Sequence, residues 1–203
     1  MQEFVSMLVL LLIYGVVHSL MAAFFMKRWV QNHMGDRAYL GLYRLVFNII
    51  AIITLLPVFY LGALEPGEIV WKLEGVLAAV FVLVQLVGLI GLVVSLLQID
   101  GMRFLGIRQL MAWLNGAPLP LPDEPMQTGG VYGLVRHPLY TFSLLFLWFS
   151  PIITTTTLGF NVGATLYFTI GSYFEERKLL ADFGDQYADY RTRVPWMIPF
   201  IRL

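Results

Sequence analysis

The chain contains no cysteine and few charged residues. The absence of cysteine from its 203 residues excludes disulfide bonds, thiolate metal ligands and a cysteine nucleophile. Charged side chains make up 13% of the sequence, about half the share found in ordinary soluble domains, whereas 59% of the residues are hydrophobic. The formal net charge of zero argues against nucleic acid as a main partner. The composition therefore predicts a protein embedded in a lipid bilayer.

Four stretches without a charged side chain are long enough to cross a membrane, for which a helix needs about 20 residues. Three of them predict single spans, at residues 4–26, 45–64 and 75–98. The fourth, residues 139–174, would reach roughly 54 Å as one helix, far beyond a hydrocarbon core of about 30 Å. It must fold back, and the proline, threonines, glycine and asparagine within residues 151–161 place the break there.

The fold class that follows is an all-α integral membrane protein with five transmembrane segments, the last two forming a tight helical hairpin. Residues 1–98 form a three-helix transmembrane region, residues 99–135 a cytoplasmic linker, and residues 136–203 the hairpin and its tail. Apolar side chains in the tail recur at helical spacing and predict a cytoplasmic amphipathic helix. They are Leu179, Leu180, Phe183, Tyr187, Tyr190 and Val194.

The distribution of lysine and arginine predicts the orientation. The loop between the second and third spans, residues 65–74, has Lys72 as its single basic residue. The other basic residues lie in segments 27–44, 100–136 and 175–203, which face the same side if the spans alternate. Because basic loops stay on the cytoplasmic side, we expect the N-terminus outside and the C-terminus in the cytoplasm.

Two polar clusters flank the fourth apolar stretch. Arg136 and His137 precede it, Tyr140 stands one turn further on, and Glu175 and Glu176 follow it. A hairpin returns to the side on which it began, so these distant residues become neighbours at one membrane face. The cluster predicts an ion-pair clamp between Arg136 and the glutamates, a ligand site, or both.

The order of motifs around this stretch resembles the isoprenylcysteine carboxyl methyltransferase and phospholipid methyltransferase superfamily. The shared elements are Gly-x-Tyr-x-x-x-Arg-His-Pro-x-Tyr, Glu-Glu, Phe-Gly-x-x-Tyr-x-x-Tyr and Val-Pro-x-x-x-Pro, within residues 130–199. The resemblance implies S-adenosylmethionine as cofactor, bound at the cytoplasmic face by the hairpin mouth and the tail. It implies cofactor contacts from Tyr132, His137, Pro138, Leu139, Tyr140 and Glu175.

Glu175 would bind the ribose hydroxyls or the amino group, since a carboxylate accepts hydrogen bonds and pairs with cations. Methyl transfer from a sulfonium needs an aligned acceptor and little covalent help, so positioning supplies much of the effect. A neutral acceptor such as a thiol needs a base, and His137 and Glu176 are the candidates for it. Arg136 is a further candidate catalytic residue. The alternative for Glu176 is the clamp partner of Arg136.

The residues near the glutamate pair and in the N-terminal half bear on the identity of the methyl acceptor. The resemblance implies an arginine one turn before the glutamate pair where the acceptor is a prenylcysteine carboxylate, but residues 169–172 read Thr-Ile-Gly-Ser. The segments at residues 14–29, 43–62 and 97–110 resemble bacterial membrane proteins related to the methanethiol S-methyltransferases and to a nitric-oxide-reductase accessory family. This favours methylation of a small thiol such as methanethiol, in a bacterial inner membrane. The alternatives are an isoprenylcysteine-type carboxyl or lipid amine acceptor, a lipophilic thiol, and a non-enzymatic haem-linked accessory protein.

Four further residues are weaker candidates for contact with the acceptor. Gln98, Asp100 and Arg103 stand where the third span reaches the cytoplasm, either near the acceptor or as solvated residues at a helix end. His18 lies inside the first span, where an ionisable side chain is a functional candidate. Its alternatives are a hydrogen bond to Asn48 in the second span or a haem ligand. No metal site is expected, and the sequence does not indicate an oligomeric state.

Overall fold

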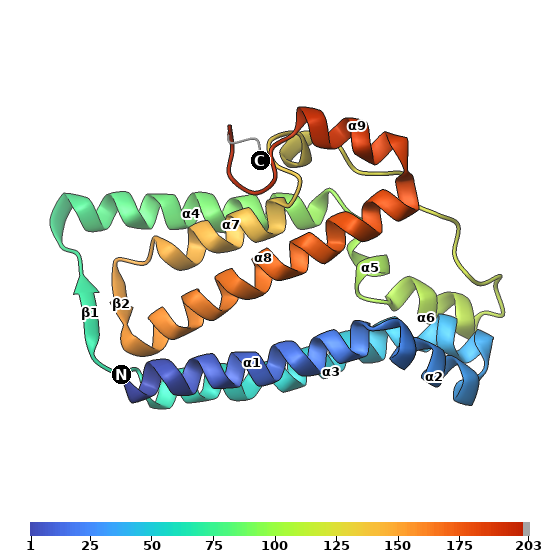
Figure 1. Ribbon diagram of the computed structural model, residues 1–203, viewed down its shortest axis with the longest axis horizontal. Coiled ribbons are helices and arrows are strands. Elements are labelled where there is room, and N and C mark those ends of the chain that lie inside the picture. The colour runs from blue at the N-terminus through green and yellow to red at the C-terminus, as the bar shows by residue number, and fades with distance from the viewer. Residues whose placement is uncertain (201–203) are drawn as a thin grey trace.

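The computed structural model describes residues 1–200, and most of these residues are helical (Figure 1). The helices are α1 (Gln2–Ala22), α2 (Phe24–Met34), α3 (Asp36–Leu64), α4 (Gly75–Leu97), α5 (Gly101–Phe104), α6 (Ile107–Leu114), the 3₁₀ helix η1 (Gly130–Gly133), α7 (Pro138–Trp148), α8 (Thr155–Phe183) and α9 (Asp185–Arg193). Two short strands, β1 (Ile69–Lys72) and β2 (Ile152–Thr154), complete the secondary structure.

Helices α1, α3 and α4 are long and apolar enough to cross a membrane, which confirms the first three predicted spans. The first ends earlier than expected, because Ala23 is extended and the chain restarts as α2. α7 has only 11 residues. α8 has 29 residues, but its charge-free part is rich in threonine and glycine.

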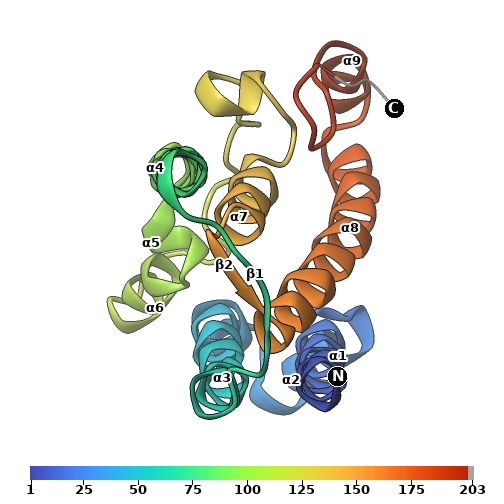
Figure 2. The ribbon, with the colours of Figure 1, turned by 90° about the vertical axis from the view of Figure 1, so that its left-hand side faces the viewer.

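Helices α1, α3, α4 and α7 form two packed pairs, and α8 contacts a member of each pair. α4 packs along α7, α3 packs along α1, and α8 contacts both α1 and α7. Figures 1 and 2 show α8 running between the two pairs, from the end that holds the strands to the end that holds α5, α6 and α9. Glycines bring α4 close to α7: a Cβ on Gly91 would stand 2.2 Å from the ring of Phe142, so small residues are needed at this contact.

The end opposite the polar clusters is closed by a two-stranded antiparallel sheet, which the all-α prediction did not include. Trp71 of β1 pairs with Ile153 of β2, and Lys72 pairs with Ile152. Additional hydrogen bonds join Leu73 N to Pro151 O and Thr155 N to Glu68 O, both at 2.8 Å. These hydrogen bonds pair backbone groups of the two segments that connect α3 to α4 and α7 to α8, which would otherwise lack partners.

The break in the fourth apolar stretch is shorter than expected and lies earlier. α7 ends at Trp148 and α8 begins at Thr155, so most of the predicted break, residues 151–161, is helix. The threonines account for the difference. Thr154 caps α8 by accepting a hydrogen bond from Thr157 N, and Thr157 Oγ1 accepts one from Thr154 N at 2.7 Å. A threonine cluster can therefore begin a helix as well as interrupt one.

The helix predicted in the tail is divided between two elements. α8 continues to Phe183, and Gly184, with a φ of 53°, separates it from α9. The predicted apolar stripe is nevertheless packed together, because Tyr187, Tyr190 and Val194 form a buried cluster against Leu179 and Phe183. Leu180 is the exception and is exposed.

Candidate functional site

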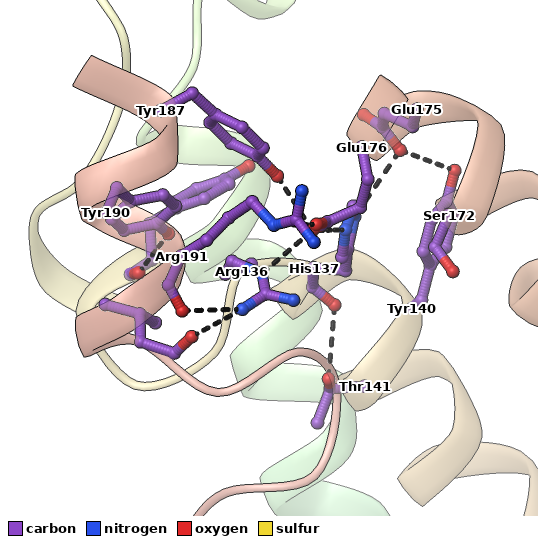
Figure 3. Close-up of polar contacts among 12 residues, drawn as sticks. Arg136, His137, Tyr140, Thr141, Ser172, Glu175, Glu176, Tyr187, Tyr190 and Arg191 are labelled. Atoms are coloured by element: carbon purple, nitrogen blue, oxygen red, sulfur yellow. Dashed lines mark hydrogen bonds and ion pairs between the residues drawn. The ribbon is translucent and has the colours of Figure 1, made fainter. Parts of the chain in front are cut away.

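Glu176 is the centre of a buried polar cluster at the mouth of α7 and α8 (Figure 3). Its Oε1 atom accepts hydrogen bonds from Arg136 Nε at 2.8 Å and Tyr187 OH at 2.8 Å, and it lies 2.9 Å from His137 Nε2. Its Oε2 atom lies 3.0 Å from Arg191 Nε. The Glu176 side chain is only 9% exposed. Four groups from two segments, the residues before α7 and helix α9, thus converge on one carboxylate, and the ion pair between Arg136 and Glu176 that the sequence suggested is present.

Glu175 has different surroundings although it is the adjacent residue. Its Oε2 atom accepts a hydrogen bond from Tyr140 OH at 3.0 Å and lies 3.5 Å from His137 Nδ1. Its side chain is 46% exposed. The Tyr140 ring stacks with His137 and with Phe168, with centroid distances of 5.6 and 5.0 Å. Glu175 therefore presents an accessible carboxylate beside an aromatic stack.

The electrostatics of the two glutamates follow from these contacts. Both lie beyond the charge-free part of α8, which ends at Phe174. Burial opposes ionisation of Glu176, but its hydrogen bonds with His137, Tyr187 and Arg136 outweigh burial and lower its pKa to about 2. Partial burial likewise opposes ionisation of Glu175, but His137 and the Tyr140 hydroxyl hold its pKa below the usual value. Both side chains are therefore carboxylates at neutral pH.

His137 stands between the two carboxylates. Burial alone would lower the pKa of its imidazole, but its interactions with Glu175 and Glu176 raise the pKa above the usual value. Both ring nitrogens face carboxylate oxygens, an arrangement that suits the imidazolium, because only the protonated ring donates from both nitrogens. His137 is therefore placed as a donor rather than as a proton acceptor.

The C-terminal tail is fixed over the start of α7 by backbone hydrogen bonds. Arg136 N donates to Pro195 O at 2.8 Å, and His137 N donates to Trp196 O at 3.2 Å. Thr141 Oγ1 donates to Met197 O at 2.7 Å. Arg136 Nη1 also donates to Val194 O at 2.8 Å. The tail thus covers the residues that the Arg-His-Pro motif places at the hairpin mouth.

The other predicted cofactor contacts lie around the same mouth. Pro138 is buried and begins α7, as expected, and Leu139 follows it in the first turn. Tyr132 lies in η1, and its carbonyl accepts a hydrogen bond from the Tyr190 hydroxyl. Burial, and then the charge of Glu175, raise the pKa of the Tyr132 phenol.

Gln98, Asp100 and Arg103 have structural partners at the end of α4. Gln98 Oε1 accepts from Val131 N at 3.2 Å, which joins α4 to η1. Asp100 caps α5 by accepting from Arg103 N at 3.0 Å, and it forms an ion pair with Arg108. Arg103 Nε lies 3.3 Å from Glu124 Oε2. Of the three, only Gln98 contacts the segment that carries a predicted cofactor residue, Tyr132.

His18 does not make the expected hydrogen bond to Asn48. The Asn48 side chain instead donates to the carbonyls of Arg44 and Phe104, at 2.9 and 3.1 Å. The Nδ1 atom of His18 is buried without a hydrogen-bond partner within residues 1–200. The His18 ring lies among aromatic rings, with centroid distances of 4.6 Å to Phe47 and 6.1 Å to Tyr167. It is separate from the cluster around Glu176.

Two cavities lie outside the predicted contacts. An apolar cavity of about 310 Å³ near the strands is lined by residues that include Val58, Phe146 and Asn161. A hollow of about 350 Å³ beside the tail is lined by Gly133, Leu134, Pro195, Pro199 and Phe200. Neither is lined by the predicted site residues. Residues 1–200 contain no group of three histidine, aspartate or glutamate side chains close enough to bind a metal ion.

Sequence reasoning missed two partners of Glu176. Tyr187 was assigned only to the apolar stripe, although its hydroxyl bonds to Glu176, and Arg191 was assigned no role. The first tyrosine of the Phe-Gly-x-x-Tyr-x-x-Tyr motif carried the missing signal, because a buried tyrosine hydroxyl usually needs a polar partner.

Comparison with known proteins agrees with the motif order. The chain matches the family model described as NnrU protein over residues 6–148. It is 31% identical over 192 residues to methanethiol S-methyltransferase 2 of Bradyrhizobium diazoefficiens, covering 95% of this chain and 71% of that protein. It is 31% identical over 202 residues to the methanethiol S-methyltransferase of Mycobacterium tuberculosis, covering 98% and 79%.

A shorter match is 35% identical over 82 residues to the protein-S-isoprenylcysteine O-methyltransferase of Tribolium castaneum, covering 39% of this chain and 29% of that protein. No solved structure matches the chain. The membrane-spanning helices and the curated relatives together define an integral membrane methyltransferase. The chain belongs to the NnrU protein family and to the family of these methanethiol S-methyltransferases. The relatives support an enzyme over the non-enzymatic accessory protein.

Proposed function

We propose that this protein transfers a methyl group from S-adenosylmethionine to a small thiol, with methanethiol as the acceptor. The observation that carries the proposal is the position of Glu175, whose half-exposed carboxylate stands beside Tyr140 and His137 at the mouth of α7 and α8. The names of the curated relatives that cover nearly the whole chain support the acceptor.

The chemistry of the residues at this mouth fits such a cofactor. The aromatic stack of His137, Tyr140 and Phe168 stands beside Glu175, and aromatic groups attract an adenine ring or a sulfonium. Glu175 offers an acceptor for ribose hydroxyls or for an ammonium group. The indole Nε1 of Trp196, in the tail beside His137, is a buried donor without a partner within residues 1–200. When bound, S-adenosylmethionine would supply an electrophilic methyl group.

The residues around Glu176 position the site. The Glu176 carboxylate already accepts from Arg136, His137 and Tyr187, and its low pKa makes it a poor base at neutral pH. His137 is held in its donor form by both glutamates. We therefore assign Arg136 and Glu176 to holding α7, α8 and the tail together, and His137 to orienting Glu175. The thiol proton then leaves to water rather than to a side chain of this cluster.

The membrane topology is part of the proposal. α7 and the charge-free part of α8 would complete five membrane segments, with the N-terminus outside and the C-terminus in the cytoplasm of a bacterial inner membrane. The distribution of the basic residues supports this orientation. Lys72 lies at the end of the protein that holds the strands, whereas the basic segments 27–44, 100–136 and 175–203 lie toward the opposite end. Residues 1–98 would anchor the protein, residues 99–135 would link its parts, and residues 136–203 would bind the cofactor.

The turn of α8 before the glutamates suits an uncharged acceptor better than a carboxylate. The turn of α8 before the glutamates carries no cation, and Ser172 there is fully buried, with its hydroxyl bonded to Thr169 O at 2.9 Å. A carboxylate in this position would lack the partner that a buried charge needs. This supports a thiol over a prenylcysteine carboxylate.

The test is methyl transfer from labelled S-adenosylmethionine to a panel containing methanethiol, a prenylcysteine and an amine phospholipid. Transfer to methanethiol, lost in Glu175→Gln and kept in Glu74→Gln, is the expected result. Glu74 is a matched control because it is exposed and pairs with Lys72 at the strand end. Transfer only to the prenylcysteine or the phospholipid would overturn the thiol assignment. An unchanged rate in Glu175→Gln would overturn the site.

A further inference from the structure

The charged cluster at the mouth of α7 and α8 is buried in its middle and accessible at two ends (Figure 3). The side chains of Arg136, His137 and Glu176 are buried. Glu175 is 46% exposed at one end of the cluster, and Arg191 is 43% exposed at the other. The cluster therefore presents a carboxylate and a guanidinium to its surroundings.

A short series of contacts connects these two accessible groups. Arg191 Nε lies 3.0 Å from Glu176 Oε2, and Glu176 Oε1 lies 2.9 Å from His137 Nε2. His137 Nδ1 lies 3.5 Å from Glu175 Oε2. Only the buried pair of Glu176 and His137 thus separates the accessible guanidinium from the accessible carboxylate, and this pair fixes their relative position.

The backbone and the Nε atom of Arg191 are both held by the cluster. Arg191 O accepts a hydrogen bond from Arg136 Nη1 at 3.1 Å, and the neighbouring Tyr190 is buried. Because Nε faces Glu176, the remaining N–H groups of the guanidinium lie on its two terminal nitrogens. In the part of the chain that the structure describes, no hydrogen bond occupies these terminal nitrogens. A guanidinium held in this way suits bidentate contact with a carboxylate.

The cluster carries more positive than negative charge. Both ring nitrogens of His137 face carboxylate oxygens, an arrangement that suits the imidazolium. With His137 protonated, the imidazolium and the guanidinium groups of Arg136 and Arg191 face only the two carboxylates of Glu175 and Glu176. A further negative charge beside Arg191 would therefore be favourable.

We propose that the terminal nitrogens of Arg191 bind the carboxylate of the methionine part of S-adenosylmethionine. This inference rests on the proposed function, which places the cofactor beside Glu175. The methionine part is a zwitterion that carries an ammonium group and a carboxylate. The two accessible groups of the cluster match it, since Glu175 can accept from the ammonium group and Arg191 can donate to the carboxylate. Arg191 thereby sets the selectivity of the site for the amino-acid end of the cofactor.

The experiment measures equilibrium binding of S-adenosylmethionine and of its decarboxylated analogue, which lacks only the carboxylate, to the purified protein in detergent. The wild type should bind S-adenosylmethionine about tenfold more tightly, as expected for one hydrogen-bonded contact between charged groups. Arg191→Gln should remove this preference by weakening S-adenosylmethionine about tenfold and the analogue less than about twofold. Arg191→Lys keeps the charge and should retain a preference of at least about threefold.

The matched control is Arg193→Gln. It removes the same charge from the same last turn of α9, where Arg193 is exposed and pairs with Asp189 at 2.8 Å. The preference for S-adenosylmethionine should be unchanged in this variant. Because the preference is a ratio of two affinities within one variant, a loss of stability in Arg191→Gln does not imitate the expected result.

An equal loss of affinity for both ligands in Arg191→Gln would overturn the inference, because it would show that Arg191 acts only on the fold, through Glu176. Equal binding of the two ligands by the wild type would do the same. So would an equal loss of preference in Arg193→Gln and Arg191→Gln, which would indicate general attraction to a basic helix. In each of these cases S-adenosylmethionine still binds, so the proposed function stands. A wild-type protein that binds neither ligand would instead overturn the proposed function itself.

Discussion

Replacement by alanine should lower the stability of the protein much more at Glu176 than at the adjacent Glu175. Glu176→Ala removes the acceptor of Arg136, His137 and Tyr187, which are held in a buried cluster. Removing one partner of a buried ion pair typically costs about 3–5 kcal/mol, because the remaining charge stays buried. Glu175 is half exposed and accepts one hydrogen bond, from Tyr140, so its loss should cost about 1 kcal/mol or less.

These costs translate into separate unfolding temperatures. At about 2–4 °C per kcal/mol for a chain of this size, Glu176→Ala should lower the midpoint by about 6–20 °C, and Glu175→Ala by less than about 4 °C. Thermal unfolding of both variants in the same detergent, followed by tryptophan fluorescence, measures the difference. Binding of S-adenosylmethionine should be lost in Glu175→Ala although that variant remains folded. Equal midpoints, or a larger loss in Glu175→Ala, would refute the division of roles.

Three further results are expected. The raised pKa of His137 gives stability that is present below its unfolded value of about 6.5 and is lost as the pH rises through the folded value. The free energy of unfolding, from denaturant titrations, should therefore fall above neutral pH in the wild type, and a His137→Gln variant with the same slope would contradict this. Tyr140→Phe keeps the stacking on Phe168 and loses only the bond to Glu175, so its affinity for S-adenosylmethionine, measured by equilibrium binding, should fall less than that of Glu175→Gln; equal affinities would be the opposite result. The visible spectrum of purified protein should lack a Soret band, and a band that disappears in His18→Ala would instead restore the haem-linked alternative.

The spans were predictable because length and hydropathy are local properties of a segment. Helices α1, α3 and α4 coincide with most of the three charge-free stretches, although α1 ends at Ala22 and α3 begins at Asp36. The break before α8 was wrongly placed, because the sequence does not show whether a threonine interrupts a helix or caps it. Thr154 caps α8 and also belongs to β2, whose partner β1 lies far away in the sequence. Pairing between two strands that lie far apart in the sequence cannot be recognised from either segment alone.

The sequence predicted that the two motifs meet at one site, but it did not predict which side chains bond to each other there. Reversal of the chain between α7 and α8 brings Arg136 and His137 to the glutamates, as their positions suggested. Spacing did not distinguish the buried Glu176 from the accessible Glu175. The suggested hydrogen bond between His18 and Asn48 was wrong, because the Asn48 side chain bonds to the carbonyl of Phe104. Phe104 lies within residues 99–135, whose path could not be inferred from the sequence.

The most direct test of this account is to locate the methyl donor on the chain. Ultraviolet crosslinking of methyl-labelled S-adenosylmethionine to the purified protein, followed by peptide mapping, should place the label in the segments containing Tyr132 to Tyr140 and Ser172 to Lys178. Excess S-adenosylhomocysteine should prevent this labelling. Label confined to α3, α4 or the strand end, or labelling that S-adenosylhomocysteine does not reduce, would contradict the claim that the polar ends of α7 and α8 enclose the donor.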